Sequence, residues 1–290
     1  MPSVLFLCVN VCAAFSKLVF ASIMTLTQKF YFKILNALLD CAGASIKSCN
    51  QCKILDCVSK SEYKFDPMSA YNSAIEISIK DALKLMTLNV NLHSEGLGFN
   101  TRAAASTWFV DAIDNTKAFV SGSPTWGTIL GVAKRNNVVM GAVNHPMLSE
   151  RLVAVGGATY YRGCNAKFKR LASQSQRAKP LTQCVVATSS ADVMTAIERA
   201  KFAKLARAVR QLIYCYDCYV YTLLAKGYVD AVFDCRFKPY DFLGLLPVLK
   251  GIGCCICSWQ GNEVCYADKI LVSRNADIRT DLLELINDTR

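Results

Sequence analysis

Two aspartates stand three residues apart at the end of an apolar run, in the segment from Trp108 to Lys117 (WFVDAIDNTK). The run is expected to be a strand, and the turn that follows Asp111 and Asp114 can present backbone N–H groups. Magnesium prefers carboxylate and carbonyl oxygens in near-octahedral geometry, and it completes its shell with water and substrate phosphate. The segment therefore favours binding of a hard divalent cation together with a phosphate group.

The same segment resembles the WxxDPIDGT signature of the inositol monophosphatase family of magnesium-dependent phosphomonoesterases. Its continuation from Lys117 to Thr128 (KAFVSGSPTWGT) is most similar to the histidinol-phosphatase branch, where GTKxFxxGxPxxGT is usual. Ala112 replaces the signature proline and Asn115 its glycine. Because asparagine tolerates positive φ better than other non-glycine residues, we expect the turn to survive.

The resemblance implies a set of metal ligands from separate parts of the chain. Ser94-Glu95-Gly96 aligns with the family's GEE element, although Gly96 replaces its second glutamate, and Lys238–Asp241 aligns with its YD element. Two or three Mg²⁺ ions are then expected, as two-metal phosphoryl chemistry requires. The expected ligands are Glu95, Asp111, the backbone carbonyl of Ile113, Asp114 and Asp241.

Thr116 ends the signature, and in the family this threonine works with an aspartate to orient the attacking water. The family element DPVTxAD, which supplies that aspartate, reads DPMSAYN here, so that Asn72 occupies the position. Asparagine can hydrogen-bond but cannot accept a proton as a carboxylate does. The expected catalytic residues are Thr116, Asn72 and Glu95, and the N–H groups of Asn115 and Thr116 are expected to hold the phosphate.

Substrate contacts are expected from Asp217, Asp234 and Asp241. Asp217 lies in YCYDCYVY, which resembles the GGDCYAY element of histidinol-phosphatases with both glycines replaced, and the second replacement, Tyr216, is expected to crowd the pocket mouth. Asp234 stands where the family often has a substrate-facing glutamate. A carboxylate at 217 would meet a cationic amino group, which fits an amino-alcohol phosphate better than a neutral polyol.

The resemblance therefore implies hydrolysis of a small phosphomonoester, histidinol phosphate in the first place, by a metal-activated water. One alternative is an inositol monophosphatase or another phosphatase of small phosphates. The other is a degenerate family member that binds a phosphorylated ligand or a partner without turnover, which Asn72, Gly96 and Tyr216 favour.

Periodicity places the elements that must position these residues. Apolar residues at helical spacing predict helices over 29–48 and 69–87, and β-branched runs at 108–113, 126–133, 138–143 and 151–156 predict an antiparallel meander. From about 183 the pattern alternates: strand 183–188, helices 191–212 and 217–226, strand 228–234, helix 240–251, strands 253–259 and 269–273, and helix 277–287. The N-terminal half (25–180) is expected to be α+β and the C-terminal half (181–290) α/β. The resemblance implies a layered αβαβα sandwich of the inositol monophosphatase and fructose-bisphosphatase type.

Composition excludes some classes of protein and partner. The chain has 290 residues, a formal net charge of +11 and 15 cysteines. Its scattered basic residues and the absence of a recognisable nucleic-acid motif argue against binding of nucleic acid. An odd number of cysteines in apolar segments favours reduced thiols and a cytoplasmic protein. Residues 1–24 are an apolar extension without a basic flank, so no stable membrane association is expected. The resemblance also implies a homodimer.

Overall fold

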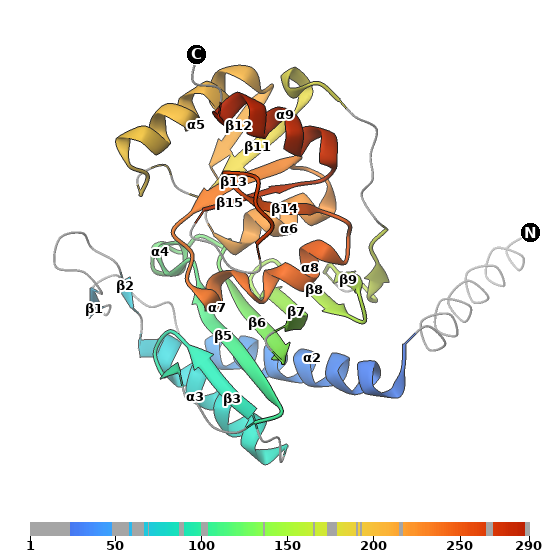
Figure 1. Cartoon of the computed structure of the whole chain (residues 1–290). Coiled ribbons are helices and arrows are strands. Elements are labelled where there is room, and N and C mark those ends of the chain that lie inside the picture. The colour runs from blue at the N-terminus through green and yellow to red at the C-terminus, as the bar shows by residue number, and fades with distance from the viewer. Residues whose placement is uncertain are drawn as a thin grey trace, which may run out of the picture.

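The computed structural model describes residues 24–47, 58–59, 67–68, 70–86, 90–99, 104–135, 137–164, 166–172, 179–189, 191, 193–214, 217–264 and 269–287. In this part of the chain, helices and sheets alternate in five layers with a buried apolar cluster at each interface between a sheet and its helices (Figure 1). The predicted αβαβα sandwich is therefore confirmed.

The larger sheet has eight strands in the order β10-β9-β8-β7-β6-β5-β3-β4. From β5 to β10 each strand pairs antiparallel with the next, which confirms the predicted meander, while β3 pairs parallel with β5. The strands are β3 (Val90–Ser94), β4 (Gly98–Phe99), β5 (Ser106–Asp114), β6 (Gly127–Lys134), β7 (Asn137–His145), β8 (Glu150–Val155), β9 (Ala158–Arg162) and β10 (Lys169–Arg170). A separate pair, β1 (Val58–Ser59) and β2 (Pro67–Met68), is antiparallel.

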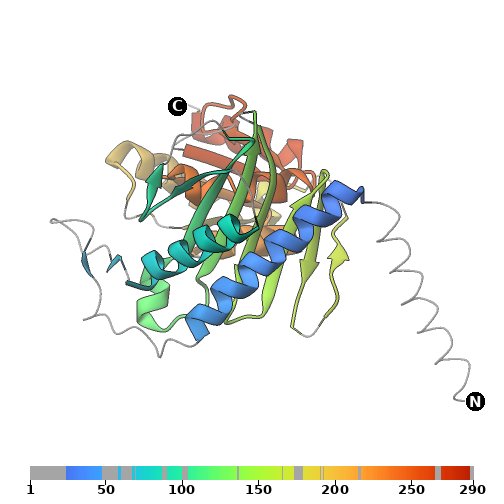
Figure 2. The same ribbon diagram turned by 90° about the horizontal axis from the view of Figure 1, so that it is seen from below.

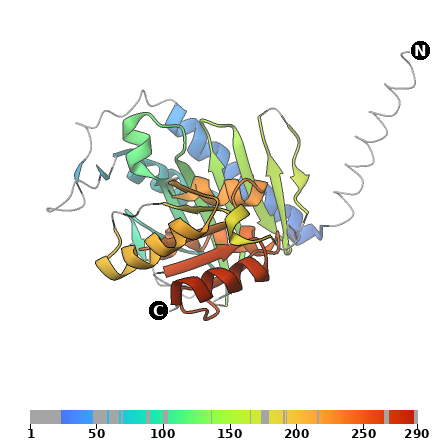
Figure 3. The ribbon, with the colours of Figure 1, turned by 90° about the horizontal axis from the view of Figure 1, so that it is seen from above.

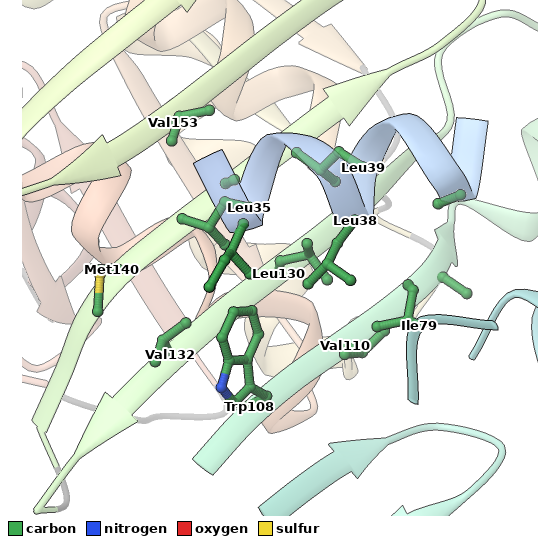
Figure 4. Packing of buried hydrophobic residues seen from close by; sticks show 14 of the residues in the cluster. Leu35, Leu38, Leu39, Ile79, Trp108, Val110, Leu130, Val132, Met140 and Val153 are labelled. Carbon is green, nitrogen blue, oxygen red and sulfur yellow. The ribbon is translucent and has the colours of Figure 1, made fainter. Parts of the chain in front are cut away.

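Helices α2 (Leu26–Lys47) and α3 (Ala70–Leu85) cover one face of this sheet (Figure 2). Apolar side chains on α2 recur every three or four residues, so one face of the helix is buried against the strands. Figure 4 shows the packing, in which side chains of both helices meet Trp108 and Val110 of β5 and Leu130 and Val132 of β6. This cluster, the first core, holds β5, which carries Asp111, Ile113 and Asp114, and α3, which carries Asn72.

The middle layer contains α6 (Cys218–Lys226), α7 (Pro239–Phe242) and α8 (Leu245–Lys250). Their buried side chains form one cluster with residues of both sheets. The smaller sheet has the order β12-β11-β13-β15-β14, with β11 (Val185–Thr188), β12 (Gln211–Tyr214), β13 (Ala231–Cys235), β14 (Cys255–Ser258) and β15 (Lys269–Ser273). Because one core joins the two sheets, the division of the chain near residue 180 into halves stays a prediction.

The outer layer is formed by α5 (Ala196–Ala208) and α9 (Ala276–Asn287), which pack side by side over the smaller sheet (Figure 3). A short 3₁₀ helix, Leu181–Gln183, precedes β11.

The predicted helix over 191–212 is wrong at both ends. Thr195 begins α5 with a capping box, because its hydroxyl accepts from Glu198 N at 3.3 Å and the Glu198 carboxylate accepts from Thr195 N at 2.7 Å. After Ala208 the chain becomes β12 and pairs parallel with β11. Residues of an edge strand this short carry no period that separates them from a helix, so only the pairing decides.

The predicted helix over 240–251 is divided into α7 and α8 around Leu243-Gly244. Gly244 lies against the backbone of two strands: a Cβ at Gly141 would stand 1.9 Å from Gly244 O, and a Cβ at Gly131 would stand 3.0 Å from Gly244 Cα. The helix breaks where three glycines let a connecting turn touch the sheet.

Met24, the last residue of the expected apolar extension, is 6% exposed and belongs to the first core, whereas residues 1–23 lie outside the described residues. Among the helices that the structure describes, none has the length and apolar character needed to cross a membrane.

Candidate active site

A bulge at the end of β5 brings the two signature aspartates together. Asp111 pairs with Ile129 and Asp114 with Gly127, so β5 has one residue more than β6 between these two pairs. In a regular strand, residues three apart point to opposite faces. The extra residue removes that alternation. Ile113, whose carbonyl is an expected ligand, falls inside the bulge.

The turn after the bulge keeps the shape that the signature glycine would give it. Asn115 has φ 68° and ψ 55°, the left-handed conformation, and precedes the short helix α4 (Thr116–Ser121). Its side-chain oxygen accepts a hydrogen bond from Ala118 N at 3.0 Å. The expected survival of the turn is confirmed, and Thr116 is buried at the first position of α4.

Glu95 reaches the site through β3, which runs parallel to β5. Ser94 pairs with Val110, so Glu95, the next residue, follows β3 at the level of Asp111. Asn72, on the buried face of α3, donates from Nδ2 to Glu95 Oε2 at 3.4 Å. Tyr71 beside it packs edge-on against Phe119 of α4, with ring centroids 6.0 Å apart. The structure thus brings Asn72 to Glu95 and places the first turn of α3 beside α4.

Asp241 enters from α7, a helix that packs against β5. Its Oδ2 accepts from Lys238 N at 2.8 Å, and it shares a side-chain hydrogen bond with Asp111. Burial raises the pKa of Asp241 to about 7, and the charges of Glu95 and Asp217 add to the effect. The carboxyl group of Asp241 therefore lies in the field of the other expected ligands.

The N-terminus of α6 points at Asp114. Cys218 N donates to Asp114 Oδ2 at 2.7 Å, and the positive end of the helix favours a carboxylate there. Burial raises the pKa of Asp114 well above its usual value, with the charges of Asp217 and Asp241 as further causes. Asp217, directly before the helix, has φ 58° and ψ −137°, a region that glycine adopts readily and other residues rarely. Tyr216 lies outside the described residues.

Asp234 is 1% exposed, on β13. It accepts from Ser189 Oγ at 2.5 Å and from Cys235 N at 3.0 Å. Burial raises the pKa of Asp234 to about 7, and the charge of Asp217 contributes. Protein covers this carboxyl group, so its contact with a substrate stays a prediction.

The donor set fits a divalent cation by its chemistry. Burial raises the pKa of Asp114 and of Asp241, and the like charges of Asp217 and Glu95 disfavour ionisation of these carboxyl groups further. A cation among them would remove that repulsion. Within the described residues, no three His, Cys, Asp or Glu side chains are already arranged as a ligand shell. One carboxylate oxygen of Asp114 and one of Asp241 each accept a hydrogen bond from a backbone N–H group.

Sequence reasoning missed Glu76, which lies one turn after Asn72 on α3 and is fully buried beside Glu95. The signal was present in the printed sequence, since Glu76 interrupts an apolar stripe formed by Ile75, Ile79 and Leu83. It also missed His145, which no motif includes. His145 contacts Trp126 O through Nδ1 and Thr222 Oγ1 through Nε2, and so links the large sheet to α6.

Comparison with known proteins points to one family. The model of the inositol monophosphatase family matches residues 29–289. The bifunctional phosphatase IMPL2, chloroplastic, of Arabidopsis thaliana is 27% identical over 263 residues, which are 86% of this chain and 72% of that protein. A histidinol-phosphatase of Chlorobaculum parvum is 23% identical over 180 residues, 62% of this chain and 67% of that one.

Solved structures show the same fold at low identity. An inositol monophosphatase from Zymomonas mobilis superposes with a TM-score of 0.75 at 21% identity, covering 90% of this chain and 98% of that one. A staphylococcal inositol monophosphatase complexed with products gives a TM-score of 0.76 at 17% identity, covering 92% and 97%.

Proposed function

Because the chain belongs to the inositol monophosphatase family, whose members are phosphatases, we propose that it hydrolyses a small phosphomonoester with the help of Mg²⁺, and that histidinol phosphate is its substrate. The observation that carries the proposal is the meeting of carboxyl groups from four separate elements at the end of β5. Acidic groups are seldom buried together unless a cation or other partners compensate them.

Glu95, Asp111, Asp114, Asp241 and the Ile113 carbonyl would hold two or three Mg²⁺ ions. When bound, Mg²⁺ would neutralise phosphoryl oxygens and lower the pKa of water.

The other residues of the site would bind and orient the reactants. Thr116 and Asn72 would orient the attacking water, and the N–H groups of Asn115 and Thr116 would hold the phosphate. The fixed position of Asn72 beside Glu95, and of Tyr71 against α4, supports this arrangement.

The choice of histidinol phosphate rests on Asp217. Its carboxylate precedes α6 and acts on Asp114, Asp241 and Asp234 through its charge. A cationic amino group beside it would be attracted by this excess of negative charge. A neutral polyol phosphate has no group that gains from it. The similarity to a histidinol-phosphatase over more than half of the chain supports the same substrate class.

Release of inorganic phosphate by the purified protein tests the proposal, with histidinol phosphate and inositol monophosphate compared in Mg²⁺ and in EDTA. We expect Mg²⁺-dependent release, faster with histidinol phosphate. Asp217→Asn should raise KM for histidinol phosphate about 10- to 100-fold, since a hydrogen bond to a charged group contributes about 1.5–3 kcal/mol. The same variant should leave inositol monophosphate nearly unaffected.

Equal use of both substrates would contradict the assignment of histidinol phosphate and favour a general small-phosphate phosphatase. Binding of Mg²⁺ without any phosphate release would favour the non-catalytic alternative. A homodimer and a cytoplasmic location stay predictions, and light scattering would check the first.

A further inference from the structure

The turn that carries Glu95 is held from behind by a second glutamate. We infer that Glu76 is a positioning residue, whose buried carboxylate fixes the β3–β4 turn so that Glu95 is presented to the metal site. This inference rests on the proposed function, because it assigns Glu95 to metal binding. Glu76 itself points into protein and is not proposed as a ligand.

The Glu76 carboxylate meets the turn through a cluster of hydrogen bonds. Ser94 Oγ donates to its Oε2 at 2.8 Å, and Leu97 N donates to the same oxygen at 3.0 Å. Gly96 N lies 3.0 Å from Oε1 and 3.1 Å from Oε2. The groups that Glu76 holds therefore flank Glu95 on both sides, and two of them are backbone N–H groups whose direction sets the path of the turn.

Helix α3 also holds the side chain of Glu95. Asn72 stands four residues before Glu76, on the same helical face, and donates to Glu95 Oε2. Ile75 and Ile79 on the adjoining face are buried in the first core. Since α3 is anchored by that core, one rigid element controls both the backbone and the carboxylate of Glu95.

Burying a glutamate costs more free energy than burying an apolar side chain of similar size. Burial raises the pKa of Glu76, the charge of Glu95 raises it further, and the hydrogen bonds from the turn offset part of the effect. An apolar side chain at this position would extend the buried stripe without that penalty. The carboxylate, unlike an apolar side chain, accepts hydrogen bonds from three donors of the turn, which are Ser94 Oγ, Gly96 N and Leu97 N.

Gly96 fits the same arrangement. A Cβ at this position would stand 2.8 Å from Glu76 Oε2 and 3.4 Å from Ser73 Oγ, so a side chain would push the turn away from α3. The glycine that replaces the family's second glutamate thus permits the close approach of Glu76. In the sequence, Gly96 stands for a missing family glutamate. In the structure, it lets Glu76 contact the turn and so helps to position Glu95.

Two measurements on Glu76→Gln test the inference. Mn²⁺, a paramagnetic substitute for Mg²⁺, reports metal affinity by electron paramagnetic resonance without any turnover. NMR-detected hydrogen exchange reports the Gly96 and Leu97 amides. We expect Mn²⁺ affinity to fall about 10- to 100-fold, the range for residues that orient metal ligands, and both amides to exchange faster.

A double-mutant cycle separates positioning from general damage. Glu95→Gln removes the ligand itself, and the double variant Glu76→Gln/Glu95→Gln should bind Mn²⁺ no more weakly than Glu95→Gln alone. Asp81→Asn, on the exposed face of the same helix, is the matched control and should bind like the wild type. If Glu76→Gln does not fold, Gly96→Ala displaces the same contact and serves in its place.

The outcomes distinguish this inference from the function on which it rests. Mn²⁺ binding by the wild type with unchanged affinity in folded Glu76→Gln would overturn the positioning role alone. Additive losses in the double variant would do the same. No Mn²⁺ binding by the wild type would overturn the proposed function together with this inference.

Discussion

Replacing Asn72 with aspartate should have opposite effects without and with metal. Asn72 Nδ2 donates to Glu95 Oε2 at 3.4 Å, so Asn72→Asp exchanges a hydrogen-bond donor for a second negative charge at the same place. Without metal the two carboxylates repel. With Mg²⁺ the introduced carboxylate could accept proton density from the attacking water, which asparagine cannot do.

The structure sets the size of the metal-free effect. Two unit charges at the 3.4 Å separating these atoms repel by about 5 kcal/mol at an effective dielectric constant of about 20. One of the two carboxyl groups can be protonated instead, which costs about 4 kcal/mol at pH 7 for a group of pKa about 4. The loss in the free energy of unfolding therefore cannot exceed this cost. Glu95 is only partly buried, so solvent screening lowers it further. We expect the free energy of unfolding to fall by about 2 kcal/mol at pH 7.

The sign of the pH dependence follows from linkage. Repulsion raises the pKa of the pair in the folded state above its unfolded value, so the folded state binds more protons and the loss shrinks as pH falls. At about pH 5 we expect a loss below about 1 kcal/mol. Urea unfolding in EDTA at both pH values measures this, with Asn137→Asp, at the exposed start of β7, as the control.

Steady-state kinetics at saturating Mg²⁺ supplies the second half of the test. General-base assistance is typically worth about 10²- to 10⁴-fold. Since metal coordination already activates the water, we expect kcat to rise by at least about tenfold with little change in KM. An equal stability loss at pH 5 and pH 7 would refute the charge argument. An unchanged kcat in a folded, metal-binding variant would refute the assignment of Asn72 to the water.

Three further predictions concern the frame around the site. Burial lowers the pKa of His145 to about 4, so the folded state favours the neutral imidazole, and this stabilisation is lost as pH falls from about 6.5 toward 4. Between about pH 7 and pH 5, the free energy of unfolding measured in urea should therefore fall by about 2 kcal/mol more for wild type than for His145→Gln. Gly127→Ala should cost about 1–3 kcal/mol in thermal unfolding, because its Cβ would stand 2.8 Å from both Cys218 Sγ and His145 Nδ1, and an unchanged Tm would show that these side chains can move aside. A protein beginning at Met24 should fold and act like the full chain, and membrane association of the full chain alone would contradict the view of residues 1–23 as dispensable. In the full chain, Met24→Asp should lower Tm because this side chain is buried in the first core.

The sequence by itself determined the elements whose signal is local. Alternating and fully apolar runs predicted the strands of the meander, because a side chain's face in a strand repeats every two residues. The spacing Asp111-x-x-Asp114 with Asn115 predicted a metal-binding turn, and Asn115 has the left-handed conformation that such a turn needs. The family match over residues 29–289 confirms the family resemblance of this segment, while metal binding by its residues stays a prediction.

Tertiary structure alone decided how the site is assembled. The bulge in β5 is a mismatch with β6, and the position of Glu95 depends on the register of β3 with β5, so neither can be found in one segment. Glu76 interrupts an apolar stripe in the sequence, but its partners lie some 20 residues away on another element. Periodicity reports only which face of an element is buried. Packing between elements decides which groups meet on that face, and it is packing that gathers these carboxyl groups at one end of β5.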